Sequence, residues 1–149
     1  MKYIYSVTNT EELKVYNNFI KINSDKIEKF LDYISKNFLV YEYPKYLVLC
    51  NLEVATRVHS GLPIPAYTNE RRVIFTPEIE VWKKIYINQL DIYNSTEQTK
   101  IIESYYDRMS DNNLLQIIGH ELVHHSELFV DDFNDELESG IWFEEGMCE

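Results

Sequence analysis

His120-Glu121-Leu122-Val123-His124 decides how this chain is interpreted, because it has the pattern H-E-x-x-H inside a segment with helical periodicity. Residues 114–119, just before it, have the apolar spacing of a buried helix. Two residues four positions apart lie on the same face of an α-helix, so both imidazoles can bind one ion. Glu121 is placed to act on a water molecule beside that ion. The pattern is typical of zinc sites with two histidine ligands and a carboxylate base.

The third protein ligand that a catalytic zinc requires is not another histidine close to the motif. Glu127 and Val130 stand three and six residues after His124, which argues against the longer metalloprotease pattern H-E-x-x-H-x-x-G-x-x-H. The stretch Trp142-Phe143-Glu144-Glu145-Gly146-Met147-Cys148-Glu149 follows a turn that we expect at residues 131–140. Twenty residues lie between His124 and Glu145, which suits one helix, a loop and the start of a second helix packed against the first.

H-E-L-V-H followed by W-F-E-E-G-M-C-E resembles the gluzincins, the thermolysin-like and aminopeptidase-like zinc peptidases, whose second motif is an aromatic pair, a variable residue and Glu-Gly. The resemblance implies that His120, His124 and Glu145 hold Zn²⁺. Apart from the resemblance, the thiolate chemistry of Cys148 makes it a minor alternative ligand. The resemblance also implies that Glu149, one turn beyond Glu145, hydrogen-bonds a ligand histidine. The implied fold is α+β and zincin-like, with a small mixed sheet whose edge strand lies beside the helix that carries H-E-x-x-H.

The activity that this resemblance implies is a zinc-dependent metallopeptidase, which hydrolyses peptide bonds through a zinc-bound water with Glu121 as general base. Its partner is a peptide or protein substrate. The resembled enzymes take a donor for the oxyanion from beyond their second motif, whereas here His59, Tyr67 and His125 are candidates by chemistry alone. Two alternatives stay open: a catalytically inactive zincin-fold binding or regulatory module, and a zinc-free acidic interaction protein.

Composition predicts one domain over residues 1–149, with 45% hydrophobic and 26% charged residues. The net charge of −11 argues against nucleic acid and anionic membranes as partners. Neither a signal peptide nor a membrane-spanning run is visible, so we expect a cytoplasmic location. The second ligand helix would have barely begun at Glu149. We therefore expect a fragment of a longer protease truncated at its C-terminus, a very small zinc domain or a degenerate one.

Periodicity and capping residues predict a mixture of helices and strands around the motif. The first expected helix begins at residue 10 with Thr8 or Thr10 as cap, and the second covers residues 24–36 with Ser24 as cap. Two further helices are expected at residues 76–91, with Pro77 in the first turn, and at residues 95–106. The last expected helix, which carries the motif, covers residues 112–129 with Ser110 or Asp111 as cap. The expected strands are residues 3–7, 46–50 and 72–75. The resemblance to gluzincins implies a substrate-facing edge strand near residues 65–68, approached through Pro63 and Pro65, and an ordinary proline-containing loop before a strand stays open as the alternative.

Overall fold

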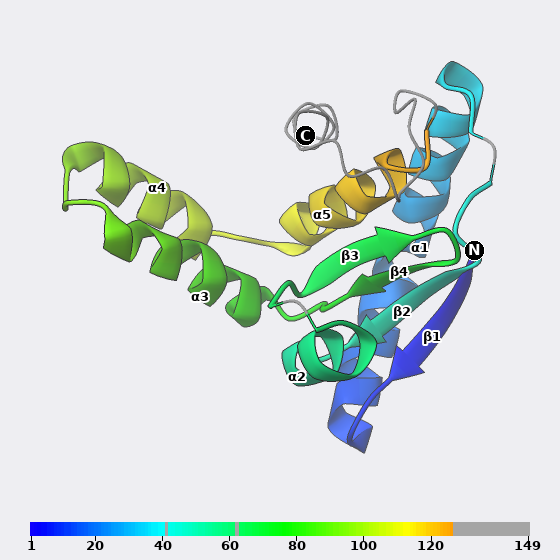
Figure 1. Cartoon of the computed structure of the whole chain (residues 1–149), viewed down its shortest axis with the longest axis horizontal. Helices are drawn as coiled ribbons and strands as arrows, with labels where there is room; N and C mark the ends of the chain where they lie inside the picture. The colour runs from blue at the N-terminus through cyan, green and yellow to red at the C-terminus, as the bar shows by residue number, and fades with distance from the viewer. Residues whose placement is uncertain (41, 62, 127–149) are drawn as a thin grey trace.

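The structure is a computed structural model, and it describes residues 1–40, 42–61 and 63–126. The elements in chain order are β1 (Lys2–Ser6), α1 (Thr10–Asn37), β2 (Tyr46–Cys50), α2 (Leu52–Val54), the π-helical turn η1 (Ala55–His59), β3 (Ala66–Asn69), β4 (Arg72–Phe75), α3 (Ile79–Gln89), the 3-10 turn η2 (Leu90–Ile92), α4 (Glu97–Asp107) and α5 (Asp111–Val123). This mixture of helices and strands confirms the predicted α+β class (Figure 1).

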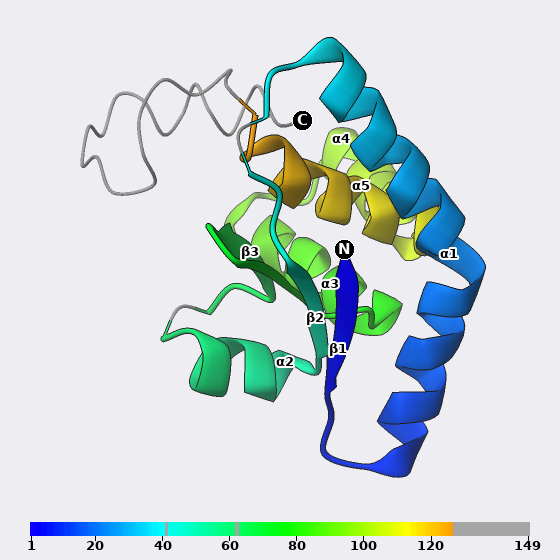
Figure 2. The same ribbon diagram turned by 90° about the vertical axis from the view of Figure 1, so that its right-hand side faces the viewer.

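Within the described residues the strands form one four-stranded mixed sheet in the order β1-β2-β4-β3. β1, β2 and β4 run parallel, and β3 pairs antiparallel with β4 at the edge of the sheet. Figures 1 and 2 show α1 and α5 on one face of this sheet and α2 with η1 on the other. α5 packs against both β3 and β4. The edge strand therefore lies beside the helix that carries the H-E-x-x-H motif.

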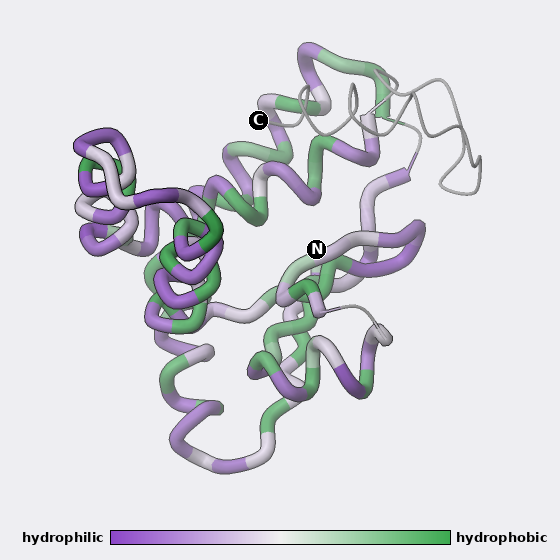
Figure 3. The backbone as a smooth tube through the Cα atoms, turned by 60° about the vertical axis from the view of Figure 1, so that its left-hand side comes forward, coloured by the Kyte–Doolittle hydropathy of each residue, from purple (hydrophilic) through white to green (hydrophobic). Residues whose placement is uncertain are grey.

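Apolar side chains separate into two cores because successive strand residues point to opposite faces. Val73 and Phe75 of β4 belong to the large core under α1 and α5, whereas Ile74 belongs to a small core with Ala55 of η1. Figure 3 shows apolar residues concentrated in the strands and alternating with polar residues along the helices. The face on which a strand residue lies can thus be read from its register.

The first helix differs from the expected pair of helices, because α1 runs unbroken from Thr10 to Asn37 and Ser24 lies in its interior. Asn23 explains the continuity, since its buried side chain donates hydrogen bonds to the Phe19 carbonyl at 3.0 Å and to the Asp111 carboxylate at 3.1 Å. The amide N–H groups of Asn23 are therefore satisfied inside the helix and against α5, whereas its side-chain oxygen is buried without a partner among the described residues. The apolar stripe continues past Asn23, with Ile27, Leu31 and Ile34 all buried.

The N-cap of α1 is Asn9, and not the predicted Thr8 or Thr10. Its side-chain oxygen accepts the backbone N–H groups of Glu11 and Glu12 at 3.0 and 2.9 Å. Asn9→Ala removes that acceptor, so we expect the free energy of unfolding to fall by about 1 kcal/mol in urea denaturation. Asn9→Asp keeps the acceptor and is the control, with little expected change. Equal urea midpoints for Asn9→Ala and the wild type would show that the cap contributes nothing.

The remaining helices agree with the expectations in part. α4 begins at Glu97 after the N-cap Thr96, close to the expected start at residue 95, whereas α3 begins at Ile79, two residues after Pro77. The residues between β2 and β3 contain α2 and η1, neither of which was predicted. The motif helix α5 begins after the predicted cap Ser110 but ends at Val123, earlier than the expected residue 129. Over the described residues, no helix combines the length and apolarity needed to cross a membrane.

Candidate metal and catalytic site

His120 and His124 come together at the C-terminal end of α5, as the motif predicts. His120 lies in the last turn of the helix. His124 is the C-cap and keeps helical backbone angles (φ −55°, ψ −18°), so the two side chains remain one turn apart on the same face. Their Nε2 atoms are 3.3 Å apart, and the rings lie at 80° to each other with centroids 5.0 Å apart. The two ring nitrogens therefore lie within hydrogen-bonding distance of each other.

This separation can be compared with the geometry that zinc requires. In a tetrahedral site with zinc–nitrogen bonds of about 2.0–2.1 Å, two histidine nitrogens lie about 3.3–3.4 Å apart. The observed 3.3 Å between the Nε2 atoms has this length. Both side chains are half-buried, so an ion there would be reached from the surface. The two imidazoles fit two corners of a zinc tetrahedron.

Glu121 lies on the neighbouring face of α5, which packs toward the edge strand. Its side chain is only 8% exposed. His125, four residues later, shows which way this face points, because its Nε2 atom lies 2.7 Å from the Thr68 hydroxyl on β3. A buried carboxylate is thus held next to the histidine pair, on the side where α5 approaches β3.

His125 itself is a buried neutral imidazole. Burial lowers its pKa to about 4, the positive charge of a protonated His124 acts in the same direction, and a hydrogen bond to the backbone of Glu42 opposes the shift. Because the contact with the Glu42 backbone favours the protonated ring, a ring N–H of His125 donates to the Glu42 carbonyl. The other nitrogen, Nε2, then accepts from the Thr68 hydroxyl. His125 therefore connects the end of α5 to β3 and to the segment before β2.

Two of the three predicted candidates for the oxyanion donor lie on the wrong face of the sheet. Tyr67 is paired with Ile74 and packs on the small core under η1, away from α5. His59 belongs to η1, and its Nε2 atom lies 3.2 Å from the hydroxyl of Ser6. Because strand residues alternate between faces, the neighbour of Tyr67 that faces α5 is Thr68. Sequence alone could not assign these faces, since they depend on which side α5 occupies.

The remaining predicted site residues, Glu145 as third ligand, Glu149 as its supporting carboxylate and Cys148 as the alternative ligand, lie outside the described residues. Within residues 1–40, 42–61 and 63–126, no group of three histidine, cysteine, aspartate or glutamate side chains is arranged to hold a metal ion. The described part of the chain thus provides two of the three predicted ligands and the predicted base. A complete ligand set depends on residues after 126.

A cavity of about 340 Å³ runs between α1 and α5 and has His120 in its wall. Its apolar lining comes from both helices and includes Ile27, Phe30 and Leu115, with Lys26 and Gln116 among its polar residues. Gly119 allows the two helices to approach, because a Cβ atom there would lie 3.2 Å from the Phe30 ring. Sequence reasoning missed this cavity, although a glycine within the motif helix was a sign of a close neighbour.

Comparisons with known proteins identify no relative. No family model matches the chain, and neither the curated proteins nor the solved structures contain a significant match. The function must therefore be argued from the site itself.

Proposed function

We propose that this protein is a zinc-dependent metallopeptidase of the zincin type, in which His120, His124 and Glu145 hold Zn²⁺ and Glu121 is the general base. The observation that carries the proposal is the 3.3 Å separation of the two Nε2 atoms, which matches two ligands of a tetrahedral zinc ion. The burial of Glu121 immediately beside this pair gives the second component of the reaction. Two imidazoles and a carboxylate are the donor set and the base that such an enzyme requires.

The arrangement of the sheet supports the same proposal. β3 is an edge strand antiparallel to its neighbour, and it packs directly against the motif helix. An edge strand presents backbone N–H and C=O groups to which an extended peptide can pair. A peptide added to β3 would pass along the face of α5 on which Glu121 lies. The proposed substrate class is therefore an extended peptide or an unfolded protein segment.

The reaction follows from the roles of these side chains. Zinc bound at this site would supply a Lewis acid that lowers the pKa of water and polarises the peptide carbonyl. His120 and His124 would hold the ion in a fixed position through the rigid turn that connects them. Glu121 accepts the proton of the attacking water and delivers it to the leaving amine. Its burial limits exchange of that proton with bulk water.

One observation favours a second candidate, a catalytically inactive zincin-fold binding or regulatory module. Tyr67 and His59 lie on the face of the sheet away from α5, so neither supplies the oxyanion donor. Such a module would bind zinc and peptide without hydrolysis.

Two expectations from composition remain predictions. One is that nucleic acid and anionic membranes are not partners of this protein, and the other is its cytoplasmic location.

Metal analysis of protein purified without chelator tests the proposal. We expect about one zinc per chain in the wild type, and at least about a tenfold loss of zinc affinity in His120→Ala, His124→Ala and Glu145→Ala, because each loses a ligand. His59→Ala removes a histidine from the opposite face of the sheet and is the matched control. Wild-type protein without zinc, or full zinc binding by His120→Ala, would contradict the proposal. Full zinc binding by Glu145→Ala would exclude Glu145 as the third ligand.

A further inference from the structure

We propose that His125 is a positioning residue that holds the edge strand β3 at the place where a peptide paired with it meets Glu121. The inference rests on the proposed function, because it concerns how the same site receives its substrate. It assigns a role to a histidine that is not part of the metal-binding pair. His125 was the third candidate for the oxyanion donor, but its ring nitrogens already bind Thr68 and the Glu42 backbone, so we infer that it acts through β3 and not on the scissile bond.

The contact between His125 and β3 is a short hydrogen bond between a buried imidazole and a half-buried hydroxyl. The Nε2 atom lies 2.7 Å from Thr68 Oγ1, and the His125 side chain is 8% exposed. The Thr68 hydroxyl has only weaker alternatives, at 3.4 Å from the Arg72 carbonyl and 3.5 Å from the Asn69 carbonyl. Breaking this hydrogen bond is costly on the His125 side, since its buried Nε2 atom would be left desolvated. The hydrogen bond therefore fixes one relative position of α5 and β3, which apolar packing alone does not do.

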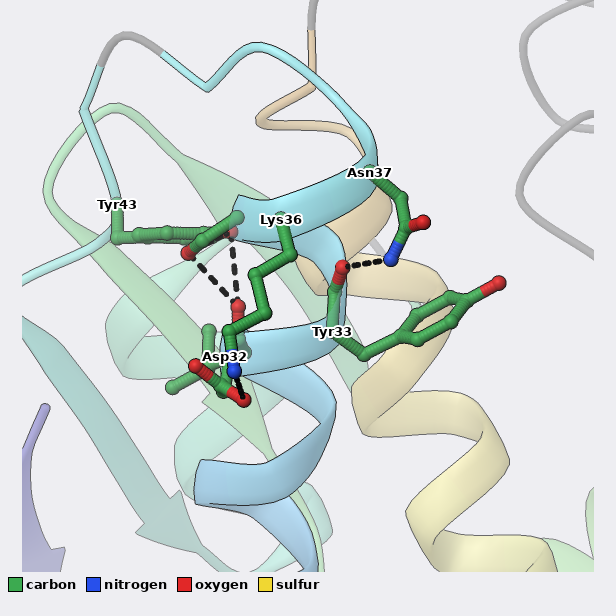
Figure 4. Close-up of polar contacts among 7 residues, drawn as sticks. Asp32, Tyr33, Lys36, Asn37 and Tyr43 are labelled. Atoms are coloured by element: carbon green, nitrogen blue, oxygen red, sulfur yellow. Dashed lines mark hydrogen bonds and ion pairs between the residues drawn. The ribbon is translucent and has the colours of Figure 1, made fainter.

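The other side of the imidazole is also attached to a fixed part of the fold. The Glu42 backbone accepts from the ring, and the neighbouring Tyr43 is anchored on the end of α1. Figure 4 shows this anchor, in which the Tyr43 hydroxyl donates to the Leu31 carbonyl at 3.2 Å and lies 3.0 Å from the Ser35 hydroxyl. The contacts of His125 thus fix the position of β3 relative to α1 as well as to α5.

This arrangement makes a specific distinction between substrates. A long extended peptide pairs with β3, so its scissile bond is placed relative to Glu121 by the position of that strand. A blocked dipeptide is too short to pair along β3 and depends on the metal site alone. Loss of the contact between His125 and Thr68 should therefore impair the long peptide and spare the short one.

Thr68→Val tests this inference with little change in side-chain shape, and His125→Phe tests it from the other side. We expect the KM of an eight-residue extended peptide to rise about tenfold or more in both variants, with kcat for a blocked dipeptide and zinc affinity changed less than about twofold. Thr68→Ser keeps the hydroxyl and should rescue the long peptide. Tyr67→Phe is the matched control, since it removes a β3 hydroxyl on the opposite face that is buried without a partner among the described residues.

A binding measurement separates this inference from the peptidase proposal. In the Glu121→Gln background, a fluorescent form of the same eight-residue peptide should bind about tenfold more weakly when Thr68→Val is added, whether or not the wild type hydrolyses it. Weakened binding without wild-type hydrolysis would overturn the peptidase activity but keep the role of His125 in placing β3. Equal losses for long and short peptides, or unchanged binding in Thr68→Val, would overturn the inference alone.

Discussion

Glu121→Gln is expected to reduce peptide hydrolysis by about 10²- to 10⁴-fold while the zinc content stays close to that of the wild type. Glutamine has nearly the same size as glutamate, and it replaces a side chain that is only 8% exposed, so the packing of α5 against β3 is retained. The amide cannot accept the proton of the attacking water, however, and the reaction loses its base. Hydrolysis of a fluorogenic peptide, measured together with the metal content of the same sample, gives both quantities.

The comparison with His120→Ala gives this experiment its specificity, because that variant should lose both zinc and hydrolysis. Glu121→Gln should lose hydrolysis alone. Hydrolysis that persists in Glu121→Gln at the wild-type rate would exclude Glu121 as the base. A wild type that binds zinc and peptide but hydrolyses nothing would favour the inactive binding module.

Phe75→Ala is expected to have the largest effect on stability, lowering the free energy of unfolding by about 3–5 kcal/mol. Phe75 lies in the interior strand β4 and is fully buried. Its ring packs between those of Phe19 on α1 and Trp82 on α3, with centroid distances of 6.0 and 6.3 Å. Truncation would leave a cavity where three elements meet. Thermal denaturation should show a melting temperature about 10 °C lower, as expected for a domain of this size.

An exposed position provides the control for this effect. Val58 on η1 is 71% exposed, so Val58→Ala should change the free energy of unfolding by less than about 0.5 kcal/mol. Phe75→Leu retains most of the apolar volume and should fall between the two. A loss in Phe75→Ala no larger than that of Val58→Ala would mean that the rings of Phe19 and Trp82 close over the gap without cost.

The elements predicted correctly from sequence are those whose signals are local. Ser110 and Thr96 mark the starts of α5 and α4 because an N-cap acts on the turn that follows it. The convergence of His120 and His124 was predictable for the same reason, since it depends on a single helical turn. These features need no knowledge of how distant parts of the chain meet.

The errors arise where distant residues decide the outcome. The chain continues as one helix through Asn23, whose amide nitrogen donates to Asp111 on the last described helix. Tyr67 was a plausible oxyanion donor by chemistry, but the side on which α5 packs excludes it. The contact of His125 with Thr68 could not be predicted, because Thr68 lies on another element. The prediction for Glu145 concerns a residue outside the described part of the chain.

The strand order indicates which strands of the sheet pair first during folding. β3 and β4 are joined by a tight turn in which Asn69 pairs with Arg72, and a hairpin of this kind forms within about 1–10 μs. β1 meets β2 only after the whole of α1 has crossed between them, since Lys2 pairs with Tyr46. The greater entropy of closing that longer loop places this pairing later. The strand proposed to receive the substrate would thus be among the earliest parts of the molecule to fold.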